Sequence, residues 1–238
     1  NAIVRTSCLL QLALGNVGVS GGGTNIFRGH DNVQGITDVG ANPDSLPGYY
    51  GLAEGSFKHF AAAWGVDFEW IKKQYAPGMM TKPGLTISRW YDAVLEKPEL
   101  IDQESNLRGM FYWGHAPNSQ SRGLDLKRGM DKLDLLVVVD PFPSATAAMA
   151  AMPGKPEDLN PKRAVYLLPA CTQFETSGSV TASNRSIQWR EKVMEPLFES
   201  RSDHMIMYQL AQKLGFAEHL VKHYKMQKVH GMDEPMPE

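Results

Sequence analysis

Cysteine is scarce in this sequence. Among 238 residues there are only two, Cys8 and Cys171. They lie far apart and form no C-x-x-C pair, which argues against a disulfide framework or a cysteine-rich metal cluster within the chain. We therefore expect two reduced thiols and a cytoplasmic protein.

The sequence also lacks an excess of positive charge and a long apolar run. A net charge of -2 argues against a nucleic-acid surface and against a polybasic membrane surface. No apolar run approaches the roughly 18–20 residues that span a bilayer. The apolar start has neither a basic cluster before it nor a small-residue cleavage site, so it is not typical of a signal peptide. We expect neither nucleic acid nor a membrane as a partner.

The usual phosphate-binding templates are missing as well. Residues 18–35, GVSGGGTNIFRGHDNVQG, are rich in glycine but contain no G-x-x-x-x-G-K-[ST], and no strand precedes them as a dinucleotide fingerprint requires. What stands out in this loop is Arg28, followed by Gly29. A guanidinium matches a carboxylate with two parallel hydrogen bonds. Arg28 is therefore a candidate anion-binding residue, with a surface ion pair as the alternative.

The middle of the chain alternates apolar runs with helical segments. Strands are predicted at 107–114, 135–140 and 164–170, with helices at 124–134 and 141–152 between them. Strands without polar alternation are typical of a parallel sheet covered on both faces. We predict an α/β fold in which ligands bind beyond the carboxyl ends of the strands, at Gly114, Asp140 and Pro169.

The remaining segments are less regular. Helices are predicted at 2–15, 52–65, 87–98 and 202–216, while residues 17–50 are loop-like and the segment from Ala217 is a polar tail. Ser202 or Asp203 is a suitable N-cap for the helix at 202–216. The first helix has no visible cap before it. We expect the chain to be a piece of a longer protein.

Several polar residues have both a structural and a functional interpretation. Asp140 can accept two hydrogen bonds from a guanine edge or a ribose diol, or it can cap the following helix, and Asp203 can likewise be a cap. His219 and His223 have i, i+4 spacing, but a glutamate precedes the first histidine, so a solvated helix face is favoured over a metal site. No Ser-His-Asp or Cys-His arrangement stands out.

Taken together, the motifs are more specific than any one of them. GNVGVSGGGTNIFRGHDNVQGITDVG and LPGYY are followed in order by FYWGHAPNS, VVVDPFPSATAA, YLLPACTQFETSGSVTASNRSIQWREKVMEP and SDHMIMYQLAQKLG. This pattern resembles the alpha (catalytic) subunits of the molybdenum- or tungsten-dependent formate dehydrogenases, which carry bis(molybdopterin guanine dinucleotide). The resemblance covers essentially the whole chain and is closest to the cytosolic NAD-dependent type.

The resemblance implies a Rossmann-like three-layer α/β domain with a mainly parallel sheet. It implies that 1–35 are the terminal helix and active-site loop of a preceding domain. Residues 36–216 would bind molybdopterin guanine dinucleotide, and 217–238 would be a truncated polar tail. The chain is then expected to be an internal fragment. The metal-ligating cysteine or selenocysteine and the iron–sulfur domain would lie elsewhere in the parent, since neither Cys8 nor Cys171 falls in that motif.

The resemblance also implies roles for the active-site loop and the first strand end. Arg28 would face the formate site, hold the substrate carboxylate and stabilise the developing carbon dioxide. His30 would approach the pterin. Gly114, His115 and Ala116 match a turn in which many relatives read G-x-N-P or G-x-D-P. Ala116 replaces the polar residue, so backbone contact is expected there.

Further positions match the part of the family that binds the dinucleotide. Val139 and Asp140 correspond to the strand end that recognises guanosine, and Thr176 and Asp203 correspond to two more contacts with the same dinucleotide. One departure is the segment 150–163, in which about a dozen extra polar residues precede the strand, a small cost by loop-closure arithmetic. We expect a surface excursion there.

By resemblance, the parent enzyme oxidises formate to carbon dioxide at a Mo or W bis-pterin centre. Electrons would pass through 4Fe-4S clusters, absent from this fragment, to an acceptor such as NAD. Partners would be formate, the remainder of the alpha subunit and electron-transfer subunits. One alternative is that the isolated chain is an inactive structural half-site. A nitrate or sulfoxide reductase as parent and an independent nucleotide-binding module are the others, and Arg28 favours formate.

Overall fold

The structure is a computed structural model that describes residues 2–24, 29, 31–41, 45–74, 84–115, 121–152, 154–221, 226–227 and 236–237. The chain divides into two compact units. One comprises Asn1–Gln74 together with Ser179–Gln188, and the other comprises Tyr75–Gly178 together with Trp189–Glu238.

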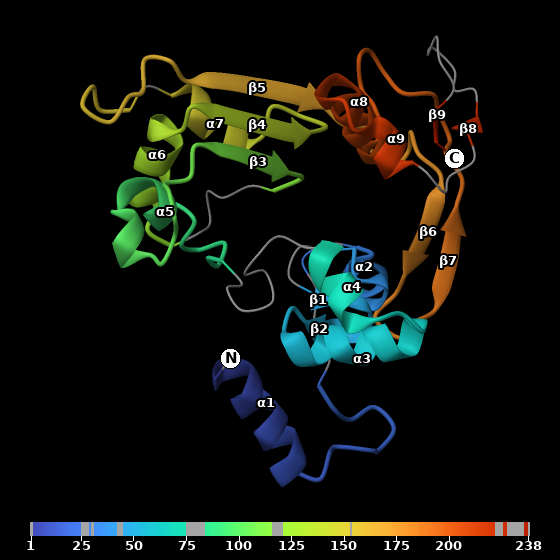
Figure 1. The fold of residues 1–238 in the computed structure, drawn as a ribbon. Coiled ribbons are helices and arrows are strands. Elements are labelled where there is room, and N and C mark those ends of the chain that lie inside the picture. Colours follow the sequence, from blue (N-terminus) through green and yellow to red (C-terminus); the bar gives the residue numbers. More distant parts are fainter. Residues whose placement is uncertain are drawn as a thin grey trace. The chain divides into compact units, whose positions relative to one another are not determined.

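The second unit is built on a three-stranded sheet. Its strands are β3 (Gly109–Trp113), β4 (Leu135–Asp140) and β5 (Ala164–Pro169), in the order β3-β4-β5. Both pairings are parallel, and the three arrows point the same way in Figure 1. In register, Trp113 pairs with Val139 and Asp140 pairs with Pro169. The predicted α/β fold with a parallel sheet is confirmed.

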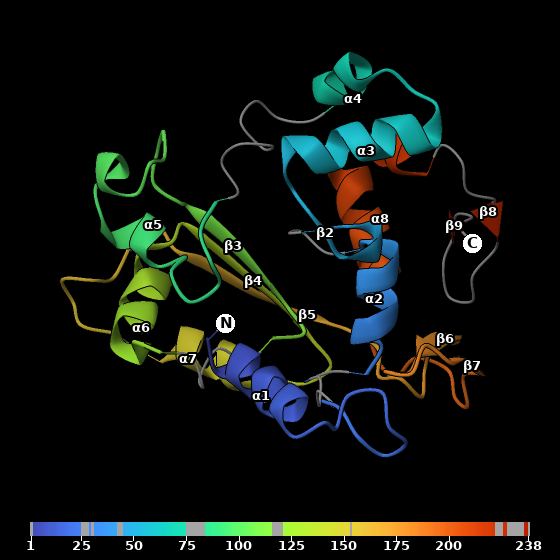
Figure 2. The ribbon, with the colours of Figure 1, turned by 90° about the horizontal axis from the view of Figure 1, so that it is seen from below.

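Successive residues of β4 pack against different helical layers because strand side chains alternate between faces. Leu136 and Val138 belong to one apolar cluster, which includes residues of α6 (Gly123–Lys132) and of α7 (Ala145–Ala151). Val137 and Val139 belong to another cluster with Ile206 of α8 (Asp203–Leu214). Figure 2 shows the strands from a second direction. A strand apolar on both faces is therefore required here, and the run LLVVVD supplies it.

The other elements are short. The first unit holds α1 (Ala2–Ala13), α2 (Val33–Val39), β1 (Ser45–Leu46), η1 (Pro47–Tyr49), β2 (Tyr50–Gly51), α3 (Glu54–Trp64) and α4 (Phe68–Gln74). The rest are α5 (Asp92–Leu95), η2 (Pro98–Leu100), β6 (Gly178–Thr181), β7 (Ile187–Arg190), α9 (Ala217–Leu220), β8 (Met226–Gln227) and β9 (Met236–Pro237). In the described residues, no helix is long and apolar enough to cross a membrane.

Helix α1 confirms the predicted element but buries none of its apolar side chains within the described structure. Ile3, Leu9 and Leu12 are all more than half exposed. The helix is therefore held by its own backbone hydrogen bonds rather than by a packed face.

Helix α2 lies inside the region predicted to be loop. Local side-chain bonds explain it: the Thr37 hydroxyl donates to the Val33 carbonyl at 2.7 Å, and the Gln34 amide donates to Asp38 at 2.8 Å. Before the helix, the Asn32 side-chain oxygen accepts the backbone N–H of Thr181 at 2.9 Å. The contact with Thr181 could not be predicted from the local glycine-rich sequence, because Thr181 is remote in sequence.

The helix predicted at 87–98 is confirmed only over Asp92–Leu95. Glu96 is already extended, and Lys97 precedes Pro98, which disfavours helical backbone at the residue before it. The Asn106 side chain completes the end by donating to the carbonyl of Glu96 at 2.7 Å.

The segment 150–163 is tied closely to α6. Asp131 is 1% exposed and accepts hydrogen bonds from Lys127 at 2.6 Å and Arg163 at 2.7 Å. Asp158 is buried and pairs with Arg128 at 3.3 Å. At Gly154 a Cβ atom would lie only 1.9 Å from the Asp131 carboxylate, so this position requires glycine. Charge pairing therefore fixes the polar segment to the body of the unit.

Candidate functional site at the carboxyl edge of the sheet

The end of β3 is a tight turn at Gly114. This glycine has φ 56°, a conformation that costs other residues free energy, and its N–H donates to the Val139 carbonyl at 2.9 Å. The next residue is His115, whose imidazole ring stacks on the ring of Tyr112 with their centroids 5.8 Å apart. The His115 carbonyl accepts a hydrogen bond from the buried Thr146 hydroxyl of α7. The turn is thus bonded both to the neighbouring strand β4 and to α7, the helix that follows β4.

The end of β4 carries Asp140. Its Oδ1 accepts the backbone N–H of Phe142 at 3.1 Å, so the carboxylate does stabilise the turn into the next helix. Only this oxygen has a hydrogen-bond partner among the described residues, which leaves Oδ2 as an acceptor. Val139 is 1% exposed and packs in the core, so its side chain is not available to a ligand.

Asp203 is the first residue of α8, and Ser202 is the N-cap by backbone position. The Ser202 side chain makes no capping hydrogen bond. The Asp203 carboxylate is bonded instead to β3, because the indole N–H of Trp113 donates to its Oδ1. This bond brings the start of α8 to the same edge as Gly114 and Asp140. A carboxylate at a helix N-terminus is also stabilised by the helix dipole.

Thr176 lies in the loop before β6, where Arg190 of β7 holds it. The guanidinium donates to the Thr176 carbonyl and, at 3.3 Å, to the Thr176 hydroxyl oxygen. Because arginine only donates, the hydroxyl proton of Thr176 remains able to donate to a further acceptor.

Glu175, the residue before Thr176, is buried and stabilises the same loop through hydrogen bonds. Its carboxylate accepts the N–H of Thr172 at 2.7 Å, the N–H of Leu197 at 2.6 Å and the Ser200 hydroxyl at 3.4 Å. The bond from the Thr172 backbone is the largest influence, and together these donors hold the pKa of Glu175 below its usual 4.5 despite burial. A buried carboxylate here stabilises loop geometry.

Sequence reasoning missed Ser144, Trp113 and Glu175. The Ser144 hydroxyl follows β4, is inaccessible to solvent, and has no hydrogen-bond partner in the described structure. Buried polar atoms normally have partners, so an unpaired hydroxyl at a strand end fits a ligand acceptor. The available signal is a serine directly before an alanine-rich helix.

Of the predicted site residues, the structure brings five to one edge: Gly114, His115, Val139, Asp140 and Asp203. Thr176 bonds to Arg190 and makes no hydrogen bond to these five among the described residues. Arg28, His30 and Ala116 lie outside the described residues. The roles expected of them stay predictions.

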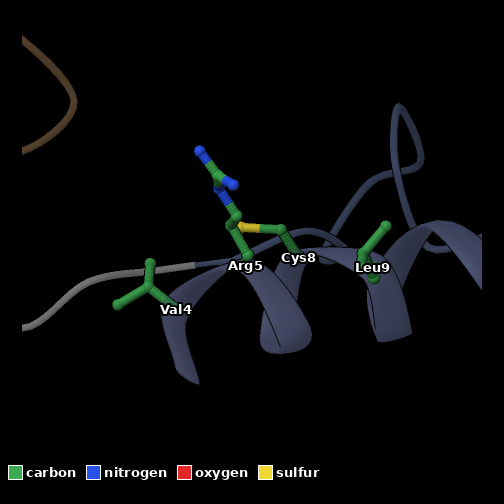
Figure 3. A pocket seen from close by; sticks show the side chains of 4 residues that line it. All are labelled: Val4, Arg5, Cys8 and Leu9. Carbon is green, nitrogen blue, oxygen red and sulfur yellow. The ribbon is translucent and has the colours of Figure 1, made fainter. Parts of the chain in front are cut away.

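The described residues also line hollows. A pocket of about 310 Å³ lies between the end of β5 and α8, where Pro169, Arg201, Ile206 and Lys213 are among its lining residues. A second, along α1, has a volume of about 560 Å³ and is lined by Val4, Arg5, Cys8 and Leu9 (Figure 3). All four come from the exposed helix, so that hollow has one wall only. The described residues contain no cluster of three or more His, Cys, Asp or Glu suited to a metal ion.

A three-stranded parallel sheet whose central strand is buried on both faces defines an α/β domain, and in open α/β domains ligands generally bind at the carboxyl edge of the sheet. The family model described as molybdopterin oxidoreductase matches residues 1–213. The chain belongs to the molybdopterin oxidoreductase family.

Its curated relatives include formate dehydrogenase subunits. The chain is 30% identical over 217 residues to the F420-dependent formate dehydrogenase subunit alpha of Methanocaldococcus jannaschii, covering 90% of this chain and 27% of that protein. It is 30% identical to formate dehydrogenase subunit alpha of Megalodesulfovibrio gigas, with 89% and 23% covered. It is 28% identical to the nitrate-inducible formate dehydrogenase major subunit of Escherichia coli, with 98% and 25% covered. The chain thus spans about a quarter of these relatives' length.

Proposed function

We propose that this chain is part of the catalytic subunit of a formate dehydrogenase and forms the binding site for one molybdopterin guanine dinucleotide. The observation that carries the proposal is the meeting of Gly114, His115, Asp140 and Asp203 at the carboxyl edge of the sheet. The names of the relatives support formate as the substrate.

The groups at this edge suit a guanine dinucleotide. The carboxylates of Asp140 and Asp203 each retain an oxygen that can accept a hydrogen bond from a guanine N–H or a ribose hydroxyl. Gly114 allows the backbone to approach a ligand closely. The unpaired Ser144 hydroxyl offers a buried hydrogen bond, and Thr176 retains a free proton to donate. The hydrogen-bonding groups of these residues therefore match those of the cofactor. Val139 contributes only by packing in the core below the site.

In this proposal Arg28 is the residue that binds the substrate. His30 lies beside the pterin, and the backbone of Ala116 lies near the dinucleotide. When bound, a molybdenum or tungsten bis-pterin centre supplies the two-electron acceptor for formate oxidation. Arg28 binds the formate carboxylate as a planar cation, orients it and stabilises the developing carbon dioxide.

The wider assembly is proposed on the same basis. The parent subunit carries the metal-ligating cysteine or selenocysteine and 4Fe-4S clusters elsewhere in its sequence. Electron-transfer subunits pass electrons to an acceptor such as NAD in the cytoplasm. Residues 1–35 belong to a preceding domain, 36–216 bind the dinucleotide and 217–238 form a tail. The 238-residue chain by itself is inactive.

The test is Arg28→Ala in the intact subunit. We expect formate turnover to fall by roughly two to three orders of magnitude, the scale of losing a transition-state charge contact, at unchanged metal content. Arg185→Ala is the matched control, because Arg185 is exposed and its ion pair with Asp38 is long, at 3.7 Å. Unchanged turnover in Arg28→Ala contradicts the assignment. Formate oxidation by the 238-residue chain alone contradicts its proposed inactivity.

A further inference from the structure

Trp113 lies at the junction of the sheet and α8. It is the last residue of β3, is half-buried, and packs against the apolar cluster that β4 and α8 share. Its indole N–H donates to Oδ1 of Asp203, ninety residues later in the chain. The bond therefore joins two of the elements that meet at the candidate cofactor edge.

The indole N–H of Trp113 affects which hydrogen bonds the Asp203 carboxylate can make to a ligand. Tryptophan is a donor only, so it binds the ionised carboxylate and takes up no proton from a ligand. Asp203 is exposed, and its carboxylate has no other described hydrogen-bond partner. The indole thus reduces the rotational freedom of an exposed carboxylate, while Oδ2 stays an acceptor.

We propose that Trp113 is a positioning residue that orients Asp203 to read the donor edge of a guanine base. This inference rests on the proposed function. Guanine presents two adjacent donors, N1–H and the N2 amine, whereas hypoxanthine lacks the amine and adenine has an acceptor at N1. A carboxylate held in place favours the first base, because its oxygens accept from donors and repel acceptors. Trp113 therefore acts on base discrimination through Asp203 and has no contact of its own with the base.

The experiment compares Trp113→Phe with wild type in the full 238-residue chain. Phenylalanine keeps the packing and removes the indole N–H. Calorimetric titration with GMP and IMP gives the ratio of the two dissociation constants. We expect Trp113→Phe to weaken GMP binding about tenfold with little change for IMP, which brings the ratio close to one. Asp203→Asn gives the same change, and the double variant adds little to either single variant.

Trp189→Phe is the matched control. The Trp189 indole also donates to a carboxylate, Glu191 at 2.6 Å, but it is 66% exposed and belongs to a different element. This variant keeps the wild-type ratio of GMP to IMP affinity. If Trp113→Phe also keeps that ratio while GMP still binds, the positioning role is wrong and the proposed cofactor site stands. If the wild-type chain binds neither nucleotide, both are wrong.

An independent readout does not depend on a nucleotide. The chain has five tryptophans, so a ¹H–¹⁵N spectrum contains five indole signals, and Trp113→Phe identifies one of them by its loss. Asp203→Asn shifts that signal and leaves the Trp189 signal in place. An unmoved Trp113 signal overturns the inference even where the variant is correctly folded.

Discussion

The buried carboxylate of Asp131 gives the sharpest test of what stabilises the second unit. Asp131→Asn keeps the shape of the side chain and removes its charge. Lys127 and Arg163 are then left without their partner, although their side chains are only 19% and 14% exposed. Removing one member of a buried ion pair costs about 3–5 kcal/mol. Because asparagine still accepts hydrogen bonds and both cations retain some contact with water, we expect the lower end of this range.

A loss of about 3 kcal/mol corresponds to a fall in Tm of roughly 10 °C for a unit of this size. Urea unfolding followed by far-UV circular dichroism measures the free energy, and an unchanged slope shows that the same surface is exposed. Glu195→Gln is the control, because its pair with Lys192 has a similar length, 2.7 Å, but side chains 46% and 59% exposed. Such a pair contributes below about 1 kcal/mol. If Asp131→Asn costs no more than Glu195→Gln, the reasoning from burial is refuted.

Two further predictions concern the segment after β5. Donors from Thr172 and Leu197 hold the pKa of Glu175 below 4.5, so its stabilisation is complete above that pH and is lost as the pH falls through the lower folded value. Glu175→Gln is therefore less stable at pH 7, and its difference from wild type shrinks below pH 4. A pH-independent difference in urea midpoints contradicts this. Burial, the largest influence, raises the pKa of the Cys171 thiol, whereas Cys8 is exposed. At pH 8 iodoacetamide modifies Cys8 at least about tenfold faster than Cys171 by peptide mass spectrometry, and equal rates count against the buried position.

The sheet could be predicted because its signal is local. Each of the runs around Tyr112, Val138 and Leu167 is apolar without alternation. Burial on both faces explains that pattern for the central strand β4, whereas Val165, Tyr166 and Leu167 of the edge strand β5 are exposed. The bounds predicted for β4 are the observed ones, and those predicted for β3 and β5 differ by at most two residues. Asp140 was recognised for the same reason, since an acid directly after three buried valines is conspicuous.

Contacts between remote residues could not be predicted. Trp113 bonds to a residue ninety positions away, and nothing in the tripeptide around it indicates a carboxylate partner. The polarity of the segment 150–163 predicts a surface excursion and no more than that. Its charges are paired with those of α6, where Asp131 and Asp158 are buried, and polarity by itself cannot distinguish paired from solvated charge.

The strands β6 and β7 have a consequence for how this chain can be divided. Ser179–Gln188, which comprises most of β6, the turn and the start of β7, belongs to the same unit as Asn1–Gln74, although more than a hundred residues separate the two in sequence. Thr181, the last residue of β6, supplies the N–H that the Asn32 side chain accepts just before α2. The first unit is therefore discontinuous, and no single cut of the polypeptide releases it whole. A fragment that ends at residue 74 lacks this hydrogen bond. Joining residues 179–188 to that fragment through a short linker gives one polypeptide that contains every residue of the first unit.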